Sequence, residues 1–398
     1  MHAVLTTALC IVLLLLSLPA VLACLYLLGL TLLSGRLPPP PPSARQLRFD
    51  VIVPAHNEEP VIARTVESLK QQNWPTDRYR IRVLADNCTD ATAQIARDAG
   101  VEVLERVDTI YRGKGHALNF AFEHSANARW ADAVVVVDAD SETSPNLLEA
   151  FAARIERGAQ AVQAHYGVLN PWASWRTRLI TIAKAAFHIV RSRARERLRV
   201  SCGIRGNGWC VTHALLRQLP YRAFSLTEDV EYGIDLGLAG WRVHYADEAH
   251  VNGEMVSTAK AASQQRRRWE GGRFELIRTR TLPLLVAALR RRNRICLDLA
   301  LDLMVLPLSY VALNVILLLL VALFAAWWNP PLLGWVFVAV LCILSMLLYV
   351  LRGWWLSGTG ARGLADLAAA PVFLVWKVAL MLQRNRSGEW VRTDRERP

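Results

Sequence analysis

The stretch Ala133-Val134-Val135-Val136-Val137-Asp138-Ala139-Asp140 decides the fold of this chain. Its five apolar residues are too few for a helix and too rich in β-branched side chains, so they predict a buried strand. Asp138 and Asp140 lie two residues apart where that strand ends, and therefore point the same way. Open α/β sheets bind ligands at this end of their strands. Two carboxylates without a nearby Cys favour Mg²⁺ or Mn²⁺ carrying phosphates over a simple strand terminus.

The composition indicates a membrane protein with one soluble domain. The chain has 398 residues, a formal net charge of +12 and 53% hydrophobic residues, and the apolar residues are concentrated at its two ends. The excess of Arg beside apolar segments favours lipid headgroups and phosphorylated substrates over nucleic acid. The seven Cys form no CxxC pair, so the sequence indicates neither a zinc site nor a disulfide framework.

The N-terminal segment predicts a retained membrane helix. Residues 3–33 form one uncharged apolar run, longer than the roughly 20 residues that span a bilayer. A signal peptide is the alternative, but the run is too long and lacks a basic start. Arg36, Arg45 and Arg48 follow it, which places the next domain in the cytoplasm. We expect residues 38–42, all proline, to form a stiff spacer that holds that domain off the bilayer.

Polar groups follow each predicted strand of the soluble domain. Strands are expected at residues 49–53, 81–85 and 101–104, separated by helices at residues 61–72 and 91–99. This order predicts a Rossmann-like βαβα sheet with a ligand crevice at the strand ends. The polar groups that follow the first two strands are Pro54, His56, Asn57, Glu58 and Asp86.

A glycine-flanked lysine offers a phosphate contact. In Gly113-Lys114-Gly115 the glycines let the backbone approach a ligand, and Lys114 can present a point charge to phosphate. A plain glycine turn with an exposed Lys114 is the alternative.

The middle of the domain contains an amphipathic and a basic segment. Residues 172–190 suit a membrane interface or an acceptor surface. Arg side chains then alternate through residues 191–199, which favours a solvated basic loop over a specific anion site. Residues 206–208 predict a sharp turn and residues 241–245 a further strand. His250, beyond that strand, reads as a polar loop residue rather than a metal ligand.

Two later motifs carry acids, cations and an aromatic ring. In Thr227-Glu228-Asp229, Thr227 is the expected helix cap and the acids fill the first turn, a pattern that helix capping alone could explain. Gln265, Arg268 and Trp269 are spaced to share one face of a helix. That face suits a sugar ring beside a diphosphate. A basic helix lying on lipid is the alternative.

The C-terminal part returns to the membrane. Residues 297–328 and 332–351 predict two further spans, and residues 364–382 an interfacial or re-entrant segment rather than a fourth span. The expected units are a membrane helix (1–37), a Pro-rich linker (38–48), an α/β domain (49–260), interfacial helices (261–295), a membrane and interfacial region (296–383) and a basic cytosolic tail (384–398).

Taken in order, four motifs resemble the D, DxD, TED, QxxRW signature of membrane-bound family 2 glycosyltransferases. They are Asp86, Asp138-Ala139-Asp140, Thr227-Glu228-Asp229 and Gln265-Arg266-Arg267-Arg268-Trp269. The resemblance implies a GT-A (Rossmann-like) cytosolic domain between transmembrane and interfacial helices. It also implies a nucleotide-sugar donor, such as a UDP-sugar, a divalent metal, and inversion at the anomeric carbon.

The resemblance further implies a role for each motif. Asp229 would be the base. The donor nucleotide would be bound by Pro54, His56, Asn57, Glu58, Asp86, Lys114 and Asp138. Asp140 with Asp138 would hold the metal, and the diphosphate and acceptor would meet Glu228, Gln265, Arg268 and Trp269.

The family contains two kinds of enzyme that fit this chain. One builds a β-linked polysaccharide, and we expect that product; the other adds a single sugar to a membrane lipid. Asn87 after Asp86, and only three firm spans, weaken the case for polymer secretion, which a partner subunit or homo-oligomer would have to assist. A non-enzymatic scaffold is disfavoured because every motif is intact. The expected location is a bacterial-type inner membrane, with several spans and a cytoplasmic catalytic domain.

Overall fold

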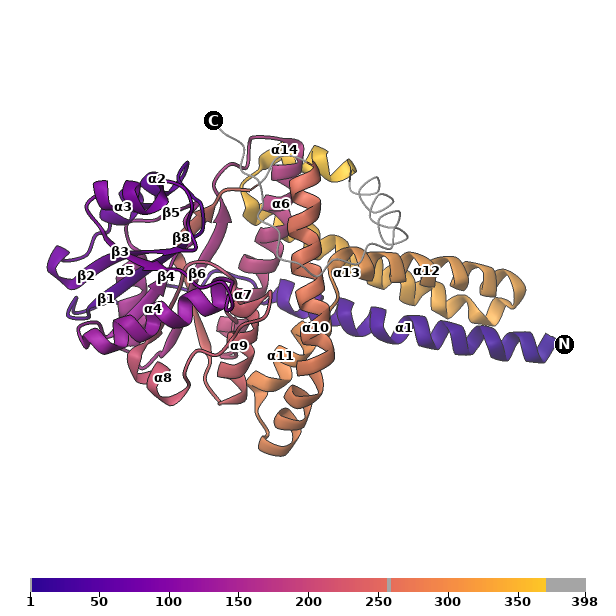
Figure 1. The fold of residues 1–398 in the computed structure, drawn as a ribbon. Coiled ribbons are helices and arrows are strands. Elements are labelled where there is room, and N and C mark those ends of the chain that lie inside the picture. Colours follow the sequence, from indigo (N-terminus) through magenta and orange to yellow (C-terminus); the bar gives the residue numbers. More distant parts are fainter. Residues whose placement is uncertain (1, 256–258, 370–398) are drawn as a thin grey trace.

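The computed structural model describes residues 2–255 and 259–369, with side chains for residues 4–255 and 269–369. An α/β domain lies on one side, and a bundle of three long helices extends from it (Figure 1). The bundle helices are α1 (His2–Leu32), α12 (Leu308–Trp328) and α13 (Gly334–Ser357).

One mixed sheet of eight strands forms the centre of the domain, in the order β3-β2-β1-β4-β7-β6-β8-β5. β1 to β4 are parallel, whereas β7 is antiparallel to both neighbours. Apolar side chains cover both faces, in two separate clusters. The strands are β1 (Phe49–Ala55), β2 (Tyr79–Asp86), β3 (Glu102–Arg106), β4 (Ala133–Val136), β5 (Ser141–Thr143), β6 (Ala161–Val168), β7 (Trp209–Thr212) and β8 (Val243–Gly253).

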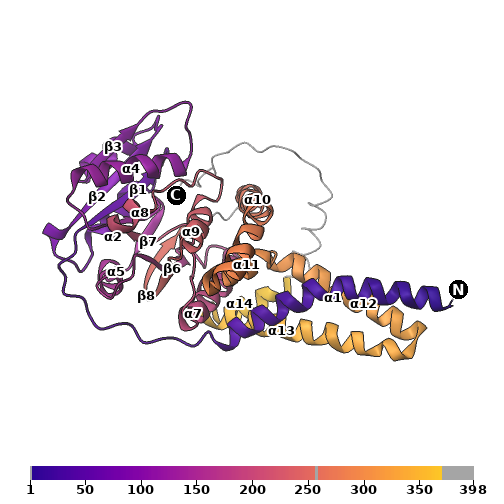
Figure 2. The ribbon, with the colours of Figure 1, turned by 90° about the horizontal axis from the view of Figure 1, so that it is seen from below.

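The helices lie on both sides of this sheet and between it and the bundle (Figures 1 and 2). Those of the domain are α2 (Ile62–Lys70), α3 (Thr92–Asp98), α4 (Lys114–Ala128), α5 (Leu147–Ile155), α6 (Trp175–Lys184), the π-helix η2 (Ala185–Val190), α7 (Arg191–Arg197), α8 (His213–Gln218) and α9 (Glu228–Leu238). Helices α10 (Ala259–Arg291), α11 (Arg294–Met304) and α14 (Gly360–Asp366) follow, with short 3₁₀ turns η1 (Thr76–Arg78), η3 (Pro330–Leu333) and η4 (Leu367–Ala369).

The three parallel strands predicted from polar strand ends are confirmed. Strands β5, β6 and β7 were missed, because each is short or has buried polar residues that break the apolar pattern. The strand predicted at residues 241–245 continues as β8 through Gly253. His250 therefore lies in a strand, and its prediction as a loop residue is wrong.

Among the described residues, three segments are long and apolar enough to cross a membrane: Val4–Leu32, Leu308–Trp328 and Pro330–Ser357. The single span expected at residues 297–328 is wrong at its start, because the backbone leaves the helix at Val305 before Pro307. Asp298 and Asp302 therefore lie in α11, outside the span. The segment expected to be interfacial begins in α14 and η4, and its remainder lies outside the described residues.

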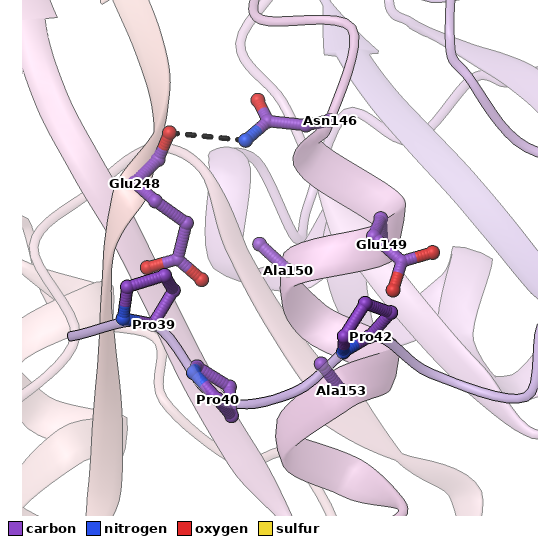
Figure 3. Close-up of a pocket in the computed structure, with 8 residues that line it drawn as sticks. All are labelled: Pro39, Pro40, Pro42, Asn146, Glu149, Ala150, Ala153 and Glu248. Carbon is purple, nitrogen blue, oxygen red and sulfur yellow. Dashed lines mark hydrogen bonds between the residues drawn. The ribbon is translucent and has the colours of Figure 1, made fainter.

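The Pro-rich linker lies on the domain instead of standing free. Backbone N–H groups of Ser43 and Ala44 donate to Glu149 and Glu156 of α5, at 2.6 and 2.8 Å. Arg45 Nε donates to the same Glu149 carboxylate at 3.0 Å. Figure 3 shows the small pocket that the linker closes, between Pro39, Pro40, Pro42 and helix α5. The linker therefore packs on α5, and its role in holding the domain off the bilayer stays a prediction.

A buried network of charges joins the domain to the bundle. Most of residues 191–199, predicted as a solvated loop, form α7, which buries Arg191 and Arg195. Arg191 Nη1 and Arg195 Nη2 approach Asp302 Oδ1 at 2.8 and 3.0 Å, and Arg195 Nε lies 3.0 Å from Asp298 Oδ2. These arginines can be buried because carboxylates of α11 neutralise their charge.

Hydroxyl groups of two bundle helices complete this network. Tyr26 of α1 accepts from Arg195 Nη2 at 2.7 Å and donates to Asp298 at 2.9 Å. Tyr349 of α13 accepts from Arg191 Nε at 2.9 Å. Burial alone would raise the pKa of Asp302, but the guanidinium groups around it, first that of Arg195, hold its pKa well below the usual range. Its charge is therefore part of the folded structure.

Replacing this carboxylate tests the junction. We expect Asp302→Asn to lower the free energy of unfolding by about 3–5 kcal/mol, because buried guanidinium groups lose their counter-charge. Glu67→Gln is the matched control, since Glu67 pairs with Lys70 at 2.8 Å on the exposed face of α2 and should cost less than about 1 kcal/mol. Thermal unfolding of the detergent-solubilised protein measures both. Equal melting temperatures for the two variants would contradict this account.

Candidate active site

The Asp138–Asp140 pair lies at the end of β4, as the sequence predicts. Asp138 N donates to Asn207 Oδ1 at 2.9 Å, and Asn207 Nδ2 donates to Ser141 Oγ at 2.7 Å. Ser141 Oγ in turn donates to Asp140 Oδ1 at 3.2 Å. Asn207 is fully buried, so it fixes the backbone of the pair to the loop at residues 206–208. This role of Asn207 was not predicted.

Lys114 connects the carboxylates of two distant motifs. Its Nζ lies 2.5 Å from Asp138 Oδ1, 3.8 Å from Glu228 Oε1 and 3.1 Å from the backbone oxygen of Gly206. Burial alone would lower the pKa of Lys114, but Asp138 and then Glu228 raise it above its usual range. Lys114 is therefore a fixed positive charge between the two motifs, and the alternative of an exposed lysine in a glycine turn is wrong.

The two acids that begin α9, Glu228 and Asp229, are both half-buried. Burial raises the pKa of Glu228 to about 7, although Lys114 opposes the shift. Burial also raises the pKa of Asp229, again against Lys114. A carboxylate whose pKa is raised accepts a proton more readily than an exposed one, which is the property required of a general base. Thr227 occupies the N-cap position, but its side chain makes no capping bond, so that part of the prediction is wrong.

A turn of glycines brings Asp229 close to the Asp138 side of the site. Gly206 has φ of +91°, and a Cβ at this position would lie 3.3 Å from Asp229 Oδ2. The backbone oxygen of the same Gly206 accepts from Lys114. One short loop thus contacts Lys114, Asp138 through Asn207, and Asp229. The loop thus brings Lys114, Asp138 and Asp229 together in one site.

The predicted nucleotide-binding residues form a second group, at the ends of β1 and β2. His56 Nδ1 lies 2.7 Å from the backbone oxygen of Asp86. Asn57, with φ of +56°, accepts from Thr89 N at 2.7 Å. Glu58 N donates to Thr92 Oγ1 at 2.8 Å. Pro54 is a residue of β1 itself, so all four residues are held where parallel strands end.

Asp86 has a partner that the sequence did not reveal. Arg106, at the end of β3, donates from Nη1 to Asp86 Oδ1 at 2.6 Å, and both side chains are buried. Arg106 Nη2 also donates to the backbone oxygen of Tyr111, in the segment leading to Lys114. The strand pairing could have indicated this contact, since Asp86 and Arg106 are direct neighbours in the β2–β3 register.

The third predicted group is described only in part. Gln265, Arg268 and Trp269 all lie in helix α10, which confirms their helical placement. Of their side chains, that of Trp269 is described, and it is 41% exposed. The side chains of Gln265 and Arg268 lie outside the described residues. One turn further, Gly272 packs on Thr227, where an added Cβ would lie 2.5 Å from Cγ2. Helix α10 thus contacts the motif that carries Asp229.

The carboxylate pair fits a divalent cation that a substrate helps to hold. Within residues 2–255 and 259–369, no group of three or more His, Cys, Asp or Glu forms a metal-binding cluster. Mg²⁺ and Mn²⁺ need no such cluster, since one or two carboxylates with phosphate oxygens and water complete their coordination. Asp138 and Asp140 supply hard oxygen donors of this kind.

Known proteins resemble this chain over the α/β domain. The family model described as "Glycosyltransferase like family 2" matches residues 46–272. A probable glycosyltransferase, YdaM of Bacillus subtilis, is 26% identical over 56% of this chain and 55% of its own length. The beta-monoglucosyldiacylglycerol synthase of Nostoc sp. is 28% identical, over 56% of this chain and 48% of its own. The chain therefore spans about half the length of these curated relatives.

Two further similarities widen the range of relatives. Glucomannan 4-beta-mannosyltransferase 7 of Arabidopsis thaliana is 23% identical, over 57% of this chain and 43% of its own length. Among solved structures, the mannosyltransferase PcManGT of Pyrobaculum calidifontis, in complex with GDP-Man and Mn²⁺, has a TM-score of 0.49 and 19% identity. It covers 87% of this chain and 98% of its own.

Two adjacent glycines of α10 test the packing beside Asp229. We expect Gly272→Ala to destabilise the protein by about 1–3 kcal/mol, because its Cβ would overlap Thr227. Gly271→Ala is the matched control, since an added Cβ meets nothing within 4 Å there and alanine favours a helix by about 1 kcal/mol. Melting temperatures of the two variants in detergent measure this difference in stability. If Gly272→Ala is as stable as Gly271→Ala, α10 does not contact Thr227 in this way.

Proposed function

Because this chain belongs to glycosyltransferase family 2, we propose that it transfers a sugar from a nucleoside-diphosphate sugar to an acceptor hydroxyl at a membrane surface. The family match and the mixed sheet confirm the expected GT-A fold class. The observation that carries the proposal is Lys114, which joins Asp138 to the Glu228–Asp229 pair in one site. A transferase of this kind needs the donor diphosphate and the acceptor base close together.

The donor would lie across the ends of β1, β2 and β4. His56, Asn57, Glu58 and Asp86 would hold the nucleoside, and a UDP-sugar is our first choice because Asp86 can read a uracil edge. Arg106 holds the Asp86 carboxylate in place, and carboxylate oxygens can accept hydrogen bonds from a base. Asp138 would lie near the ribose and donor sugar, beside the fixed charge of Lys114.

A divalent cation, Mg²⁺ or Mn²⁺, would be held by Asp138 and Asp140. When bound, it neutralises charge that develops on the departing diphosphate. Lys114 contributes to the same stabilisation from the protein itself, since its half-buried ammonium is held by Asp138 before the reaction. Arg268 is proposed as a further contact of the diphosphate.

Asp229 is the proposed general base. In the reaction, the acceptor oxygen forms a bond to the anomeric carbon, while the bond from that carbon to the diphosphate oxygen breaks. The acceptor proton passes to Asp229 Oδ2. Attack opposite the departing group inverts the configuration, which requires the base and the diphosphate site to lie on different sides of the sugar. Asp229 comes from another segment than the Asp138–Asp140 pair, which supports this assignment.

The acceptor is a β-linked polysaccharide or a membrane lipid. Growth of a polysaccharide needs a polar path, which a partner subunit or homo-oligomer could supply. The described spans favour the lipid instead, because they meet through an apolar core. That core includes Leu27, Val315, Leu318, Ala339 and Cys342. We therefore propose lipid glycosylation as the second candidate, supported by this packing.

The proposed location is a bacterial-type inner membrane, crossed by α1, α12 and α13. The basic residues after α1 would place the α/β domain in the cytoplasm, where nucleotide sugars are made. The buried contacts of α7 with Tyr26 and Tyr349 would then hold the active site at the inner membrane surface.

Two isosteric variants test the division of roles. We expect Asp229→Asn to lower kcat by at least about 10²–10⁴-fold, since the proton acceptor is lost, while binding of the nucleotide sugar is retained. Asp140→Asn should instead weaken metal-dependent binding of the nucleotide sugar. Product release and isothermal titration in lipid nanodiscs measure the two effects. Asp98→Asn, at the exposed end of α3, is the control.

Two results would contradict the roles proposed for Asp229 and Asp140. Near wild-type transfer by Asp229→Asn would remove Asp229 as the base. Loss of nucleotide-sugar binding in that variant, with Asp140→Asn unchanged, would show that the two roles had been exchanged.

A further inference from the structure

Tyr166 lies between the donor and acceptor halves of the proposed site, and no motif includes it. It follows an irregularity where the pairing of β6 with β8 moves from Ala164↔Ala246 to His165↔His250. Irregularities of this kind re-aim side chains and are frequent beside active sites. Here the result is a half-buried tyrosine near three carboxylates, Asp138, Asp140 and Asp229.

The backbone at two glycines, Gly206 and Gly253, packs against the edges of the Tyr166 ring. A Cβ at Gly206 would lie 4.0 Å from Tyr166 Cε1 and 3.3 Å from Asp229 Oδ2. A Cβ at Gly253 would lie 3.1 Å from both Tyr166 Cε2 and Oη. The next residue, Glu254, donates its N–H to the backbone oxygen of Asp140 at 3.2 Å. One edge of the ring thus adjoins the proposed base, and the other adjoins the metal-site strand end.

Lys184 covers one face of the ring. Its Nζ lies 3.1 Å from the ring centroid, which is a close cation–π contact. The side chain is buried, and its ammonium donates to the backbone oxygen of Gly167 at 3.4 Å. The ion pairs of the described residues do not include it. Burial lowers the pKa of Lys184 to about 7, although Asp140 and Asp138 oppose the shift.

The helix that carries Lys184 is fixed by the membrane bundle. Lys184 ends α6, and the π-helix η2 follows at once; π turns are frequent at functional sites. The backbone oxygen of Ala186 in η2 accepts from Tyr349 Oη at 2.9 Å. Gly353 of α13 packs on the same Ala186, where an added Cβ would lie 2.7 Å from its Cβ. The position of Lys184 is therefore set by a proposed membrane span.

We propose that Tyr166 is an acceptor-binding residue, whose ring supports the sugar or headgroup that carries the attacking hydroxyl, and that Lys184 is the positioning residue that holds this ring beside Asp229. This inference rests on the proposed function. His188 also packs on Tyr166, with ring centroids 5.3 Å apart, and the residue is only half-buried. The surface of the ring that Lys184, His188 and the two glycines leave open is the part proposed to meet the acceptor. Sugar rings and glycerol chains present C–H groups that pack well on an aromatic face.

Steady-state kinetics in phosphatidylcholine nanodiscs test this inference. The probes are UDP-glucose as donor, with diacylglycerol in the bilayer or a soluble alkyl β-glucoside as acceptor. We expect Tyr166→Leu to raise the acceptor KM about tenfold or more and to leave the donor KM unchanged, because only the acceptor loses its platform. Tyr166→Phe keeps the ring, so its acceptor KM should stay within about threefold of the wild-type value.

The lysine has its own pair of variants. Lys184→Met should raise the acceptor KM about fivefold, because the cation–π contact that holds the ring is lost, and Lys184→Arg should restore most of the wild-type acceptor KM. Lys70→Met is the matched control, since Lys70 lies on the exposed surface of α2. If Tyr166→Leu fails to fold, the Lys184 pair still decides the outcome through the acceptor KM.

The results that would contradict this inference differ from those that would contradict the proposed function. An unchanged acceptor KM in both Tyr166→Leu and Lys184→Met, or a donor KM that rises equally, would overturn this inference and leave the proposed function intact. A wild-type protein that turns over no nucleotide sugar on any acceptor would contradict the proposed function, and this inference with it.

Discussion

The buried pairing of Arg191 and Arg195 with Asp302 is the interaction on which the rest of the structure depends. It lies where α7, α11 and two bundle helices meet, and each side chain would be costly to bury alone. Arg205 Nη1 lies 3.7 Å from Asp302 Oδ2, and Arg205 directly precedes Gly206. The loop that contacts Lys114 and Asp229 is therefore held by the same carboxylate that attaches the domain to the bundle. The attachment of the domain to the bundle and the geometry of the candidate site thus share one set of charges.

The proposed site follows from this anchoring. The loop fixes Asp138 through Asn207, while α10 packs on Thr227 and α13 packs on η2. Between them Lys114 supplies the positive charge that lets Asp138, Glu228 and Asp229 lie close together. Without it, the buried acids would repel one another and take up protons.

The sequence predicted those parts of the fold that depend on local pattern. The β4 strand with Asp138 and Asp140, the helix beginning at Glu228 and the position of three spans all follow from periodicity or from strand and helix ends. The burial of Arg191 and Arg195 could not be predicted in this way. Alternating arginines are typical of a solvated loop, and the sequence does not show that Asp302 lies beside them. Tyr166 and Lys184 were missed for the same reason: their contact depends on an irregular strand pairing and on a helix held by α13. The roles of the motif residues, including Gln265 and Arg268, stay predictions.

The central claim is that this site moves a sugar from a nucleotide to an acceptor at the membrane. The most direct measurement incubates the purified protein in lipid nanodiscs with a panel of labelled UDP- and GDP-sugars, Mg²⁺ or Mn²⁺, and membrane lipids. Mass spectrometry then identifies the product. This account predicts release of the nucleoside diphosphate together with label on a lipid or on a β-linked glycan. Label found only as free sugar, or no turnover of any donor, would contradict it.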